Sequence, residues 1–367
     1  MTNAATANTA TTSTPEVDFA QVEALAGKIV GMMTGGAVCA GIVLGDQLGL
    51  YRTMGSGEAM GADQLAAAAG CHPRLTREWL DGQAAAGLIG YDPQTDRYRL
   101  SAEAAMVLAD EDSPAFLAGG TTMFQAIFDA IPKLVAAFKG DGGLGWGEHH
   151  PALFTATARF FRPGYRTNLI AQWIPALPGV ADKLAAGGSI ADVGCGFGHS
   201  CTVLAEAFPN AEVWGFDFHE PSVQAARINA ANLGLGGRVQ FEAVSSTRYG
   251  GRYDLICFFD CLHDMGDPVG IARHARERLA PDGTVLLVEP FALGNRADNI
   301  AGNPVAGLFY HASTFICTPS SLAQEVGRGM GAQSGETGMR AVFEEAGFTQ
   351  FRVAHTSPFN LVYEARA

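Results

Sequence analysis

The chain has 367 residues, of which 48% are hydrophobic and 17% are charged, so it can fill the cores of two domains. Its formal net charge is -13 and its isoelectric point is near 5.1. Because such a surface repels phosphate backbones and anionic membranes, we expect neither nucleic acid nor a membrane among its partners. The seven cysteines include no Cys-x-x-Cys pair and no secretory signal is evident, which predicts reduced thiols and a cytoplasmic protein.

Two N-terminal segments differ in composition. Residues 1–15 are rich in Ala, Thr, Asn and Ser without a hydrophobic period, which predicts a disordered tail. A domain over 16–110 follows, and it opens with apolar residues at helical spacing. The 17 uncharged residues between Lys28 and Asp46 include five glycines, a poor match to the ~20 strongly apolar residues of a membrane span. We expect a buried helix, interrupted near Gly35 and Gly36, that packs against a second subunit in a homodimer.

The rest of this domain has the pattern of a winged helix-turn-helix. Segments 62–69 and 73–86 have helical composition, and 88–100 alternates around an Asp-Pro turn as a β-hairpin does. Such a module either reads DNA through its second helix or serves as a dimerisation scaffold. Its few arginines are offset by acidic residues: Arg74, Arg77, Arg97 and Arg99 against Asp63, Glu78, Asp81, Asp92 and Asp96. We favour the dimerisation scaffold, because phosphate contacts need a basic face.

Residues 111–184 form a helical connector that is rich in aromatic side chains. We expect it to cover an apolar pocket for a small-molecule substrate, together with an insertion at 291–333. The candidate lining residues are Phe124, Phe128, Trp146, His149, Phe161, Tyr165 and His311.

From 185 to 367 strands and helices alternate, which predicts an α/β domain. Strands are expected near 189–193, 211–217, 238–243, 253–259, 283–289, 348–355 and 359–365, and helices near 199–208, 220–233, 267–280 and 336–346. The fold class is therefore a Rossmann-like seven-stranded sheet whose last strand is antiparallel, behind an all-helical, winged-helix N-terminal domain. The insertion at 291–333, rich in Gly, Asn, Ser and Pro around an apolar centre, is expected to be a long loop that acts as a lid.

A glycine turn follows the first strand of this domain. Gly194, Gly196 and Gly198 let backbone approach a ligand where a Cβ would obstruct it. The dinucleotide fingerprint Gly-x-Gly-x-x-Gly needs glycine at 199, where this chain has histidine, so a pyrophosphate ligand is disfavoured. Asp217 ends the next strand, 217 − 194 = 23 positions after Gly194, close to the ~20 expected for a carboxylate that holds a ribose diol.

The run from Asp192 to Gly198 resembles motif I of the class I S-adenosylmethionine (SAM) methyltransferases. The whole chain is similar to actinobacterial methyltransferases with an N-terminal winged helix, and the stretch Trp79 to Leu88 supports that wider match. The resemblance implies SAM as cofactor and S-adenosylhomocysteine (SAH) as product. It assigns the methionine part of SAM to Asp192, Gly194, Cys195, Gly196 and Gly198, the ribose to Asp217, the adenine to Phe218 and to Ser245 or Ser246, and the border of the methyl-transfer centre to Phe259 and Asp260.

A chemical candidate follows the fourth strand. The sequence Leu262-His263-Asp264 resembles the Leu-His-Asp-Trp motif of small-molecule O-methyltransferases, with Met265 in place of Trp. That resemblance implies that His263 deprotonates the acceptor hydroxyl and that Glu289 orients the histidine. An imidazole with an ordinary pKa near ~6.5 suits this task at neutral pH, because a phenol is a far better nucleophile once its proton has an acceptor.

Several alternatives share the same residues. An N- or C-methyltransferase, or a SAM-binding enzyme without methyl transfer, would use the same cofactor site. A SAM-sensing DNA-binding regulator would use the winged helix, and a nicotinamide oxidoreductase could use the glycine turn. We expect no metal site, because no constellation of carboxylates is evident and Cys257 and Cys261 lack a second ligand pair.

Overall fold

A computed structural model describes residues 17–367, so the tail predicted for 1–15 lies outside the described residues. The N-terminal part contains α1 (Phe19–Gln47), α2 (Leu50–Thr53), α3 (Ala62–Ala69), α4 (Pro73–Ala85), β1 (Gly90–Asp92), β2 (Arg97–Arg99) and α5 (Ala102–Leu108). β1 and β2 pair antiparallel around the predicted turn. The two helices and the wing therefore form as expected, with Tyr98 of the wing and Leu80 of α4 in one buried core.

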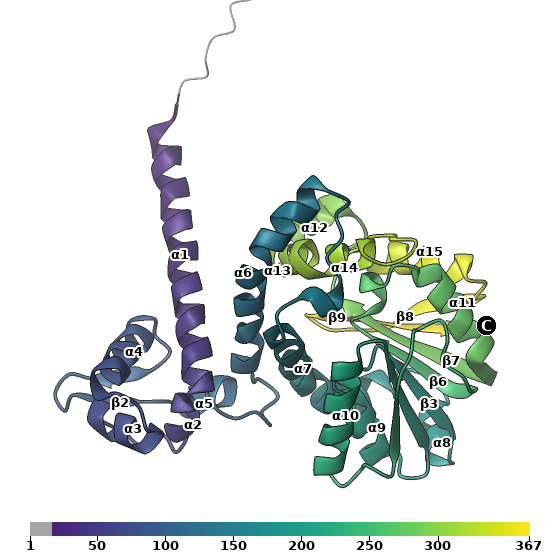
Figure 1. Cartoon of the computed structure of the whole chain (residues 1–367), viewed down its shortest axis with the longest axis horizontal. Coiled ribbons are helices and arrows are strands. Elements are labelled where there is room, and N and C mark those ends of the chain that lie inside the picture. The colour runs from purple at the N-terminus through teal and green to yellow at the C-terminus, as the bar shows by residue number, and fades with distance from the viewer. Residues whose placement is uncertain (1–16) are drawn as a thin grey trace, which may run out of the picture.

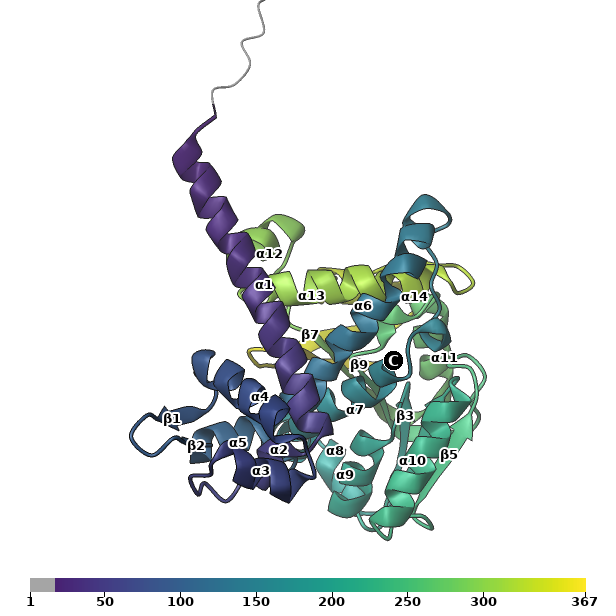
Figure 2. The same ribbon diagram turned by 60° about the vertical axis from the view of Figure 1, so that its left-hand side comes forward.

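The first helix differs from the expectation. α1 runs without a break through Gly35 and Gly36, so the predicted interruption is wrong. A Cβ at either glycine would meet nothing within 4 Å, and the side chain of Asp18 caps the helix by accepting from the N–H of Ala20. The N-terminal part of the helix projects away from the rest of the chain (Figures 1 and 2), its C-terminal part packs against α4 and α6, and most of its residues are exposed rather than buried. Among the described residues it is the one helix long and apolar enough to cross a membrane.

The connector joins this part to the sheet. It contains α6 (Ala118–Lys139), η1 (Trp146–Glu148), α7 (Ala152–Gly164), η2 (Tyr165–Trp173, a π-helix) and α8 (Val180–Ala185). Arg159 of α7 pairs with Asp46 at the end of α1, with Nη1 2.6 Å from Oδ2, and also contacts Glu111. This half-buried ion pair fixes the base of α1 against the connector.

The C-terminal domain has the predicted seven-stranded sheet, in the order β5-β4-β3-β6-β7-β9-β8. β9 pairs antiparallel with both β7 and β8, and the strands from β3 to β7 that pair are parallel. The strands are β3 (Ser189–Val193), β4 (Glu212–Asp217), β5 (Val239–Ala243), β6 (Tyr253–Phe259), β7 (Leu279–Pro290), β8 (Gln350–Thr356) and β9 (Asn360–Arg366). The main helices are α9 (His199–Ala207), α10 (Glu220–Asn232), α11 (Pro268–Arg278) and α15 (Gly335–Glu345).

The two faces of this sheet carry separate cores. One core joins the sheet to η2, α8, α9 and α10, and the other joins it to α11 and α15. Alternating residues of β3 illustrate the division, because Ile190 faces the first core and Ala191 the second. Helices on both faces leave the carboxyl ends of the parallel strands as the edge where ligands bind in such sheets.

The insertion is helical, so the predicted long loop is wrong. It contains α12 (Arg296–Gly302), α13 (Ala306–Ala312), η4 (Ser313–Cys317, a π-helix) and α14 (Thr318–Leu322). Phe309, Ile316 and Cys317 pack against Ala126 and Ile127 of α6 in one buried cluster. These apolar residues recur at helical spacing, which outweighs the glycines and prolines around them. The insertion and α6 together cover the ends of the strands (Figure 2).

Candidate active site

The glycine turn lies at the carboxyl end of β3, next to β4 and β6. Gly194 and Gly198 have φ of +80° and +72°, a region that side chains with a Cβ rarely adopt. A Cβ on Gly194 would lie 2.8 Å from Sγ of Cys261, and one on Gly198 would lie 2.7 Å from the ring of Phe241. At Gly196, by contrast, a Cβ would meet nothing within 4 Å. The turn thus packs tightly at its two ends and leaves its middle open.

Asp192 lies beneath this turn and is fully buried. Its Oδ2 accepts hydrogen bonds from Oγ of Ser200 and, at 3.2 Å, from Sγ of Cys201. Oδ1 is buried without a hydrogen-bond partner among the described residues. Burial raises the pKa of Asp192 to about 6, against the two hydrogen bonds that lower it. A buried acceptor without a donor is a position where a cation or an N–H group of a ligand is stabilised.

Asp217, predicted to hold a ribose, ends β4 beside the turn. Its Oδ2 accepts from the N–H of Gly196 at 2.9 Å, and its Oδ1 accepts from the N–H of His219 at 2.8 Å. Burial raises the pKa of the carboxyl group, while the backbone hydrogen bonds oppose that shift. The carboxylate therefore holds the open middle of the turn in place. Phe218 beside it is 60% exposed, which leaves one ring face free to stack on a ligand.

The remaining predicted cofactor residues lie at the same edge of the sheet. Ser245 and Ser246 follow β5, where Ser245 is exposed and Ser246 is half-buried. Phe259 ends β6 and packs against Tyr165, with ring centroids 5.3 Å apart. Asp260 has φ of +49°, and its Oδ1 accepts from Nδ2 of Asn360 at 2.9 Å while Oδ2 is buried without a described partner. Burial raises the pKa of Asp260 well above its usual range.

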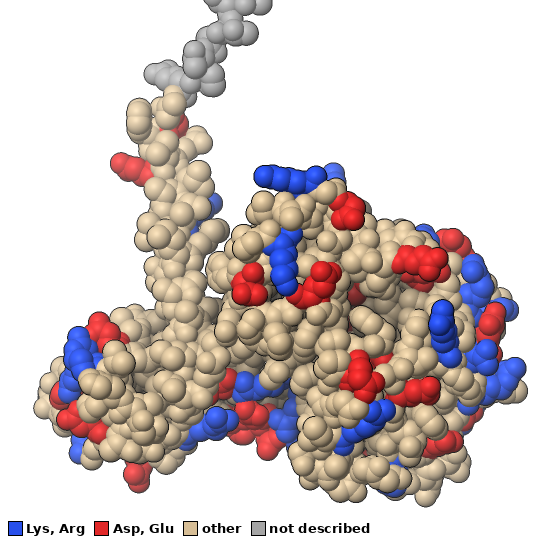
Figure 3. Space-filling view, in the orientation of Figure 1, with Lys and Arg blue, Asp and Glu red and all other residues tan. Residues whose placement is uncertain are grey.

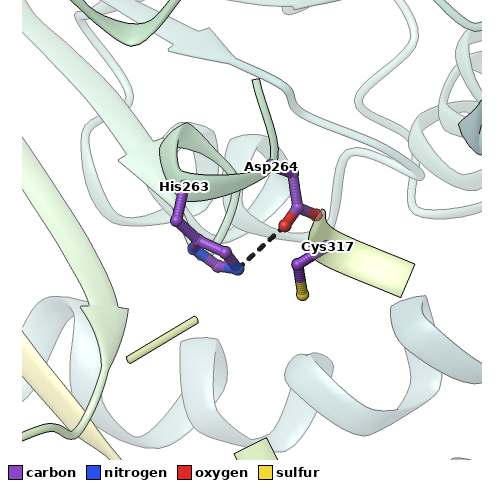
Figure 4. Close-up of side chains that lie close together, drawn as sticks. All are labelled: His263, Asp264 and Cys317. Carbon is purple, nitrogen blue, oxygen red and sulfur yellow. Dashed lines mark ion pairs between the residues drawn. The ribbon is translucent and has the colours of Figure 1, made fainter. Parts of the chain in front are cut away.

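The structure brings His263 and Glu289 together. His263 lies on the short 3-10 helix η3 (Leu262–Asp264), Glu289 lies near the end of β7, and both are 3% exposed. Nδ1 of His263 is hydrogen-bonded to Oε2 of Glu289, and Nε2 lies 2.9 Å from Oδ1 of Asp264. Burial lowers the pKa of His263, but the two carboxylates outweigh it, so the pKa is raised well above its usual range. Figure 4 shows the ring facing Asp264 with Cys317 beside them.

The predicted lining residues divide into two groups. The first group is buried or half-buried: Trp146, His149, Phe161 and Tyr165. Trp146 packs against Phe154, which in turn packs against His219 with ring centroids 4.5 Å apart. Tyr165 contacts Phe259 as well as Phe161, and His149 is 5% exposed.

The second group is exposed on the surface of the described chain. Phe124 and Phe128 are 39% and 63% exposed on α6. His311 is exposed on α13 and accepts or donates only within its own helix, to the carbonyl of Gly307. Both faces of α6 are apolar, so spacing alone could not separate the inner residues from the outer ones.

Two side chains at the site were missed as site residues. Asp264 follows His263 directly, so its position beside the ring could have been read from the motif. Cys317 comes from the insertion, 317 − 263 = 54 positions later, and had no motif to mark it. Phe154 and His219, which extend the aromatic wall, likewise stand outside any motif.

Two segments of the chain match models of known protein families. A model of the family described as "Methyltransferase domain" matches residues 184–329, and one described as "Rv2258c-like winged HTH domain" matches residues 36–110. The polyketide synthase ThaQ of Burkholderia thailandensis is 27% identical over 107 residues, which are 29% of this chain and 5% of that protein. The chain spans 5% and 27% of the lengths of the two curated relatives it matches.

Solved structures share the fold over nearly the whole chain. An O-methyltransferase family protein from Burkholderia thailandensis has a TM-score of 0.68 at 17% identity and covers 93% of this chain and 97% of its own. Human N-acetylserotonin methyltransferase, solved in complex with SAM, has a TM-score of 0.67 at 18% identity and covers 93% and 97%. The chain therefore has the fold of these methyltransferase structures, with a segment that matches a methyltransferase-domain model behind one that matches a winged helix-turn-helix model.

Proposed function

We propose that this protein transfers the methyl group of SAM to a hydroxyl oxygen of a small aromatic or hydrophobic acceptor, with His263 as the general base. The observation that carries the proposal is the buried pair of His263 and Glu289 at the same sheet edge as the glycine turn. A histidine held by a carboxylate at the end of the strands is placed to receive a proton from a group bound there.

The residues around the glycine turn fit the cofactor. The unpartnered Oδ1 of Asp192 suits the ammonium group of the methionine part, and the open backbone at Gly196 gives room for it. Asp217 at the end of β4 suits the ribose hydroxyls, and the exposed ring of Phe218 suits the adenine. When bound there, SAM would supply a methyl group on a positively charged sulfur.

The chain itself contributes position and proton transfer. Glu289 bonds Nδ1 of His263, so the ring is oriented and Nε2 is the nitrogen left for the acceptor's proton. Because Glu289 and Asp264 both favour the protonated ring, the proton moves readily from the hydroxyl to Nε2. The same carboxylates make the neutral ring scarcer at low pH. The rate should therefore rise with pH through the raised pKa of His263.

An aromatic acceptor follows from the connector. The half-buried ring of Tyr165 packs against Phe259 at the end of β6, and the half-buried rings of Trp146 and Phe154 form a second group against His219. Flat apolar molecules bind between such rings. Several structural neighbours are named as O-methyltransferases, which supports oxygen over nitrogen or carbon.

A test uses SAM with a deuterated methyl group and a set of aromatic alcohols, amines and thiols. We expect the mass label on a hydroxyl oxygen, located by fragmentation of the product. Label on nitrogen or carbon would favour the corresponding transferase. SAM binding without any transfer, combined with salt-dependent binding to duplex DNA, would favour a regulator.

A homodimer is the expected assembly. α1 exposes Val22, Leu25, Ile29, Met32 and Met33, and α6 exposes Phe124, Phe128, Ile131, Val135 and Phe138. Each set recurs every three or four residues, as in a seam between helices. Figure 3 shows α1 with few charges along its length. A second copy covers such surfaces, so we expect no membrane partner and a cytoplasmic location.

Nucleic acid remains an unfavourable partner for the winged helix. Arg77 pairs with Asp96 at 3.1 Å, and Arg74 pairs with Glu78, so two of the module's four arginines are neutralised within it. Light scattering tests the proposed homodimer. It should give a dimer for the wild type and a monomer for the double variant Leu25→Asp, Ile29→Asp. The control Glu23→Gln, on the same helix, should stay dimeric. A wild-type monomer would contradict the assembly.

A further inference from the structure

The side chains of His263, Asp264 and Cys317 form a cluster at the end of η3 with more potential metal-ligand atoms than a proton relay uses. One atom each from His263, Asp264 and Cys317 lies within 4.8 Å of the other two. His263 and Cys317 are buried and Asp264 is half-buried. Oδ1 of Asp264 lies 2.9 Å from Nε2 of His263 as an ion pair. The three donors thus converge on a shared space (Figure 4).

We propose that His263, Asp264 and Cys317 form a binding site for a divalent transition-metal ion of the zinc type. One imidazole nitrogen, one carboxylate oxygen and one thiolate sulfur are the ligand set that zinc prefers, whereas magnesium and calcium prefer oxygen alone. Ligands around a tetrahedral zinc ion lie roughly 3.3–3.6 Å apart. To bind zinc, the widest spacing between the three ligand atoms need shorten by only about 1 Å, which side-chain rotation allows.

A further observation supports the site. Glu289 bonds Nδ1 of His263 and so leaves Nε2 directed at the cluster, as carboxylates do for metal-binding histidines.

Binding replaces two protons. The metal ion takes the position of the proton on Nε2 of His263 and of the thiol proton of Cys317, and both protons leave to solvent. The metal-bound ring cannot accept a proton from a hydroxyl, so a loaded enzyme would be inactive if His263 is the base. That consequence rests on the proposed function, whereas binding of the metal does not.

The test titrates the full-length, metal-free protein with Cd²⁺, whose bond to a thiolate absorbs in the ultraviolet. We expect one equivalent to saturate the absorbance and Zn²⁺ but not Mg²⁺ to displace it. Cys317→Ser should abolish the band and weaken Zn²⁺ binding in calorimetry by tenfold or more. Cys71→Ser, at a half-buried thiol in the winged-helix domain, should leave both unchanged. A band that persists in Cys317→Ser, or a wild type without a saturable band, would overturn the site.

A second measurement does not depend on a variant. X-ray absorption of the Zn²⁺-loaded wild type should show one sulfur at about 2.3 Å and nitrogen or oxygen at about 2.0 Å. A shell without sulfur, or with two or more sulfurs, would contradict the ligand set. If Zn²⁺ binds but the loaded enzyme still transfers methyl groups, only the role of His263 as base is refuted.

Discussion

The ribose position allows a prediction that needs no knowledge of the acceptor. Asp217→Asn keeps the size of the side chain but replaces one acceptor oxygen with an N–H₂ group. In the wild type both oxygens already accept from backbone N–H groups, at 2.9 Å and 2.8 Å. The amide oxygen can accept from only one of these N–H groups. The variant therefore loosens the turn at Gly196 and removes the carboxylate to which a ribose hydroxyl would donate a hydrogen bond.

The expected magnitude comes from the lost hydrogen bond to a charged group, about 1.5–3 kcal/mol. Each 1.4 kcal/mol is tenfold in affinity, so the Kd for SAH should rise roughly 10- to 150-fold. Isothermal titration calorimetry measures this directly. Glu212→Gln is the matched control, because Glu212 is an exposed carboxylate at the opposite end of β4 and should bind SAH as the wild type does. Unchanged affinity in a folded Asp217→Asn variant would refute the ribose assignment.

Three other outcomes follow from the same contacts. Glu289→Gln should reduce turnover and move the rising limb of the pH–rate profile to lower pH, because the carboxylate that raises the pKa of His263 is gone; an unshifted limb would contradict the pairing. Gly198→Ala, whose Cβ would lie 2.7 Å from Phe241, should lower the free energy of unfolding in urea by about 2–4 kcal/mol. Gly234→Ala has the same φ of +72° but its Cβ would lie in open space. It should lower the free energy of unfolding only by the cost of the left-handed backbone conformation, about 1–2 kcal/mol. Burial lowers the pKa of His199 to about 4, so the neutral ring stabilises the fold fully above pH ~6.5 and this stabilisation falls by up to about 3 kcal/mol as the pH drops toward 4. Denaturation curves of His199→Gln should lack this loss of stability. Equal acid sensitivity of the wild type and the variant would count against it.

The sheet was predictable because its signals are local. The central strands β3 and β6 are short apolar runs bounded by turn residues, and the antiparallel position of β9 followed from the short turn before it. The pairing of His263 with Glu289 was anticipated through the family resemblance, since both follow or end neighbouring strands. Parallel strands bring their carboxyl ends together whatever their separation in sequence.

Other features depended on contacts that a single sequence does not reveal. The insertion was expected to be a loop because of its composition, yet burial of Phe309 and Ile316 against α6 favours helices. The same helix has a second apolar face, so Phe124 and Phe128 were assigned to the pocket although they are exposed. α1 was expected to be broken at two glycines, but nothing crowds them and the helix continues. Tertiary packing outweighs local propensity in each case.

The central claim is that His263 accepts the proton of a hydroxyl that becomes methylated. The most direct measurement compares transfer of a deuterated methyl group from SAM by the wild type and by His263→Ala, with SAH affinity measured on both. We predict labelled oxygen in the wild type and a loss of turnover of roughly 10²–10⁴-fold in the variant, at nearly unchanged SAH affinity. Undiminished transfer by His263→Ala, or label on nitrogen or carbon in the wild type, would contradict the account.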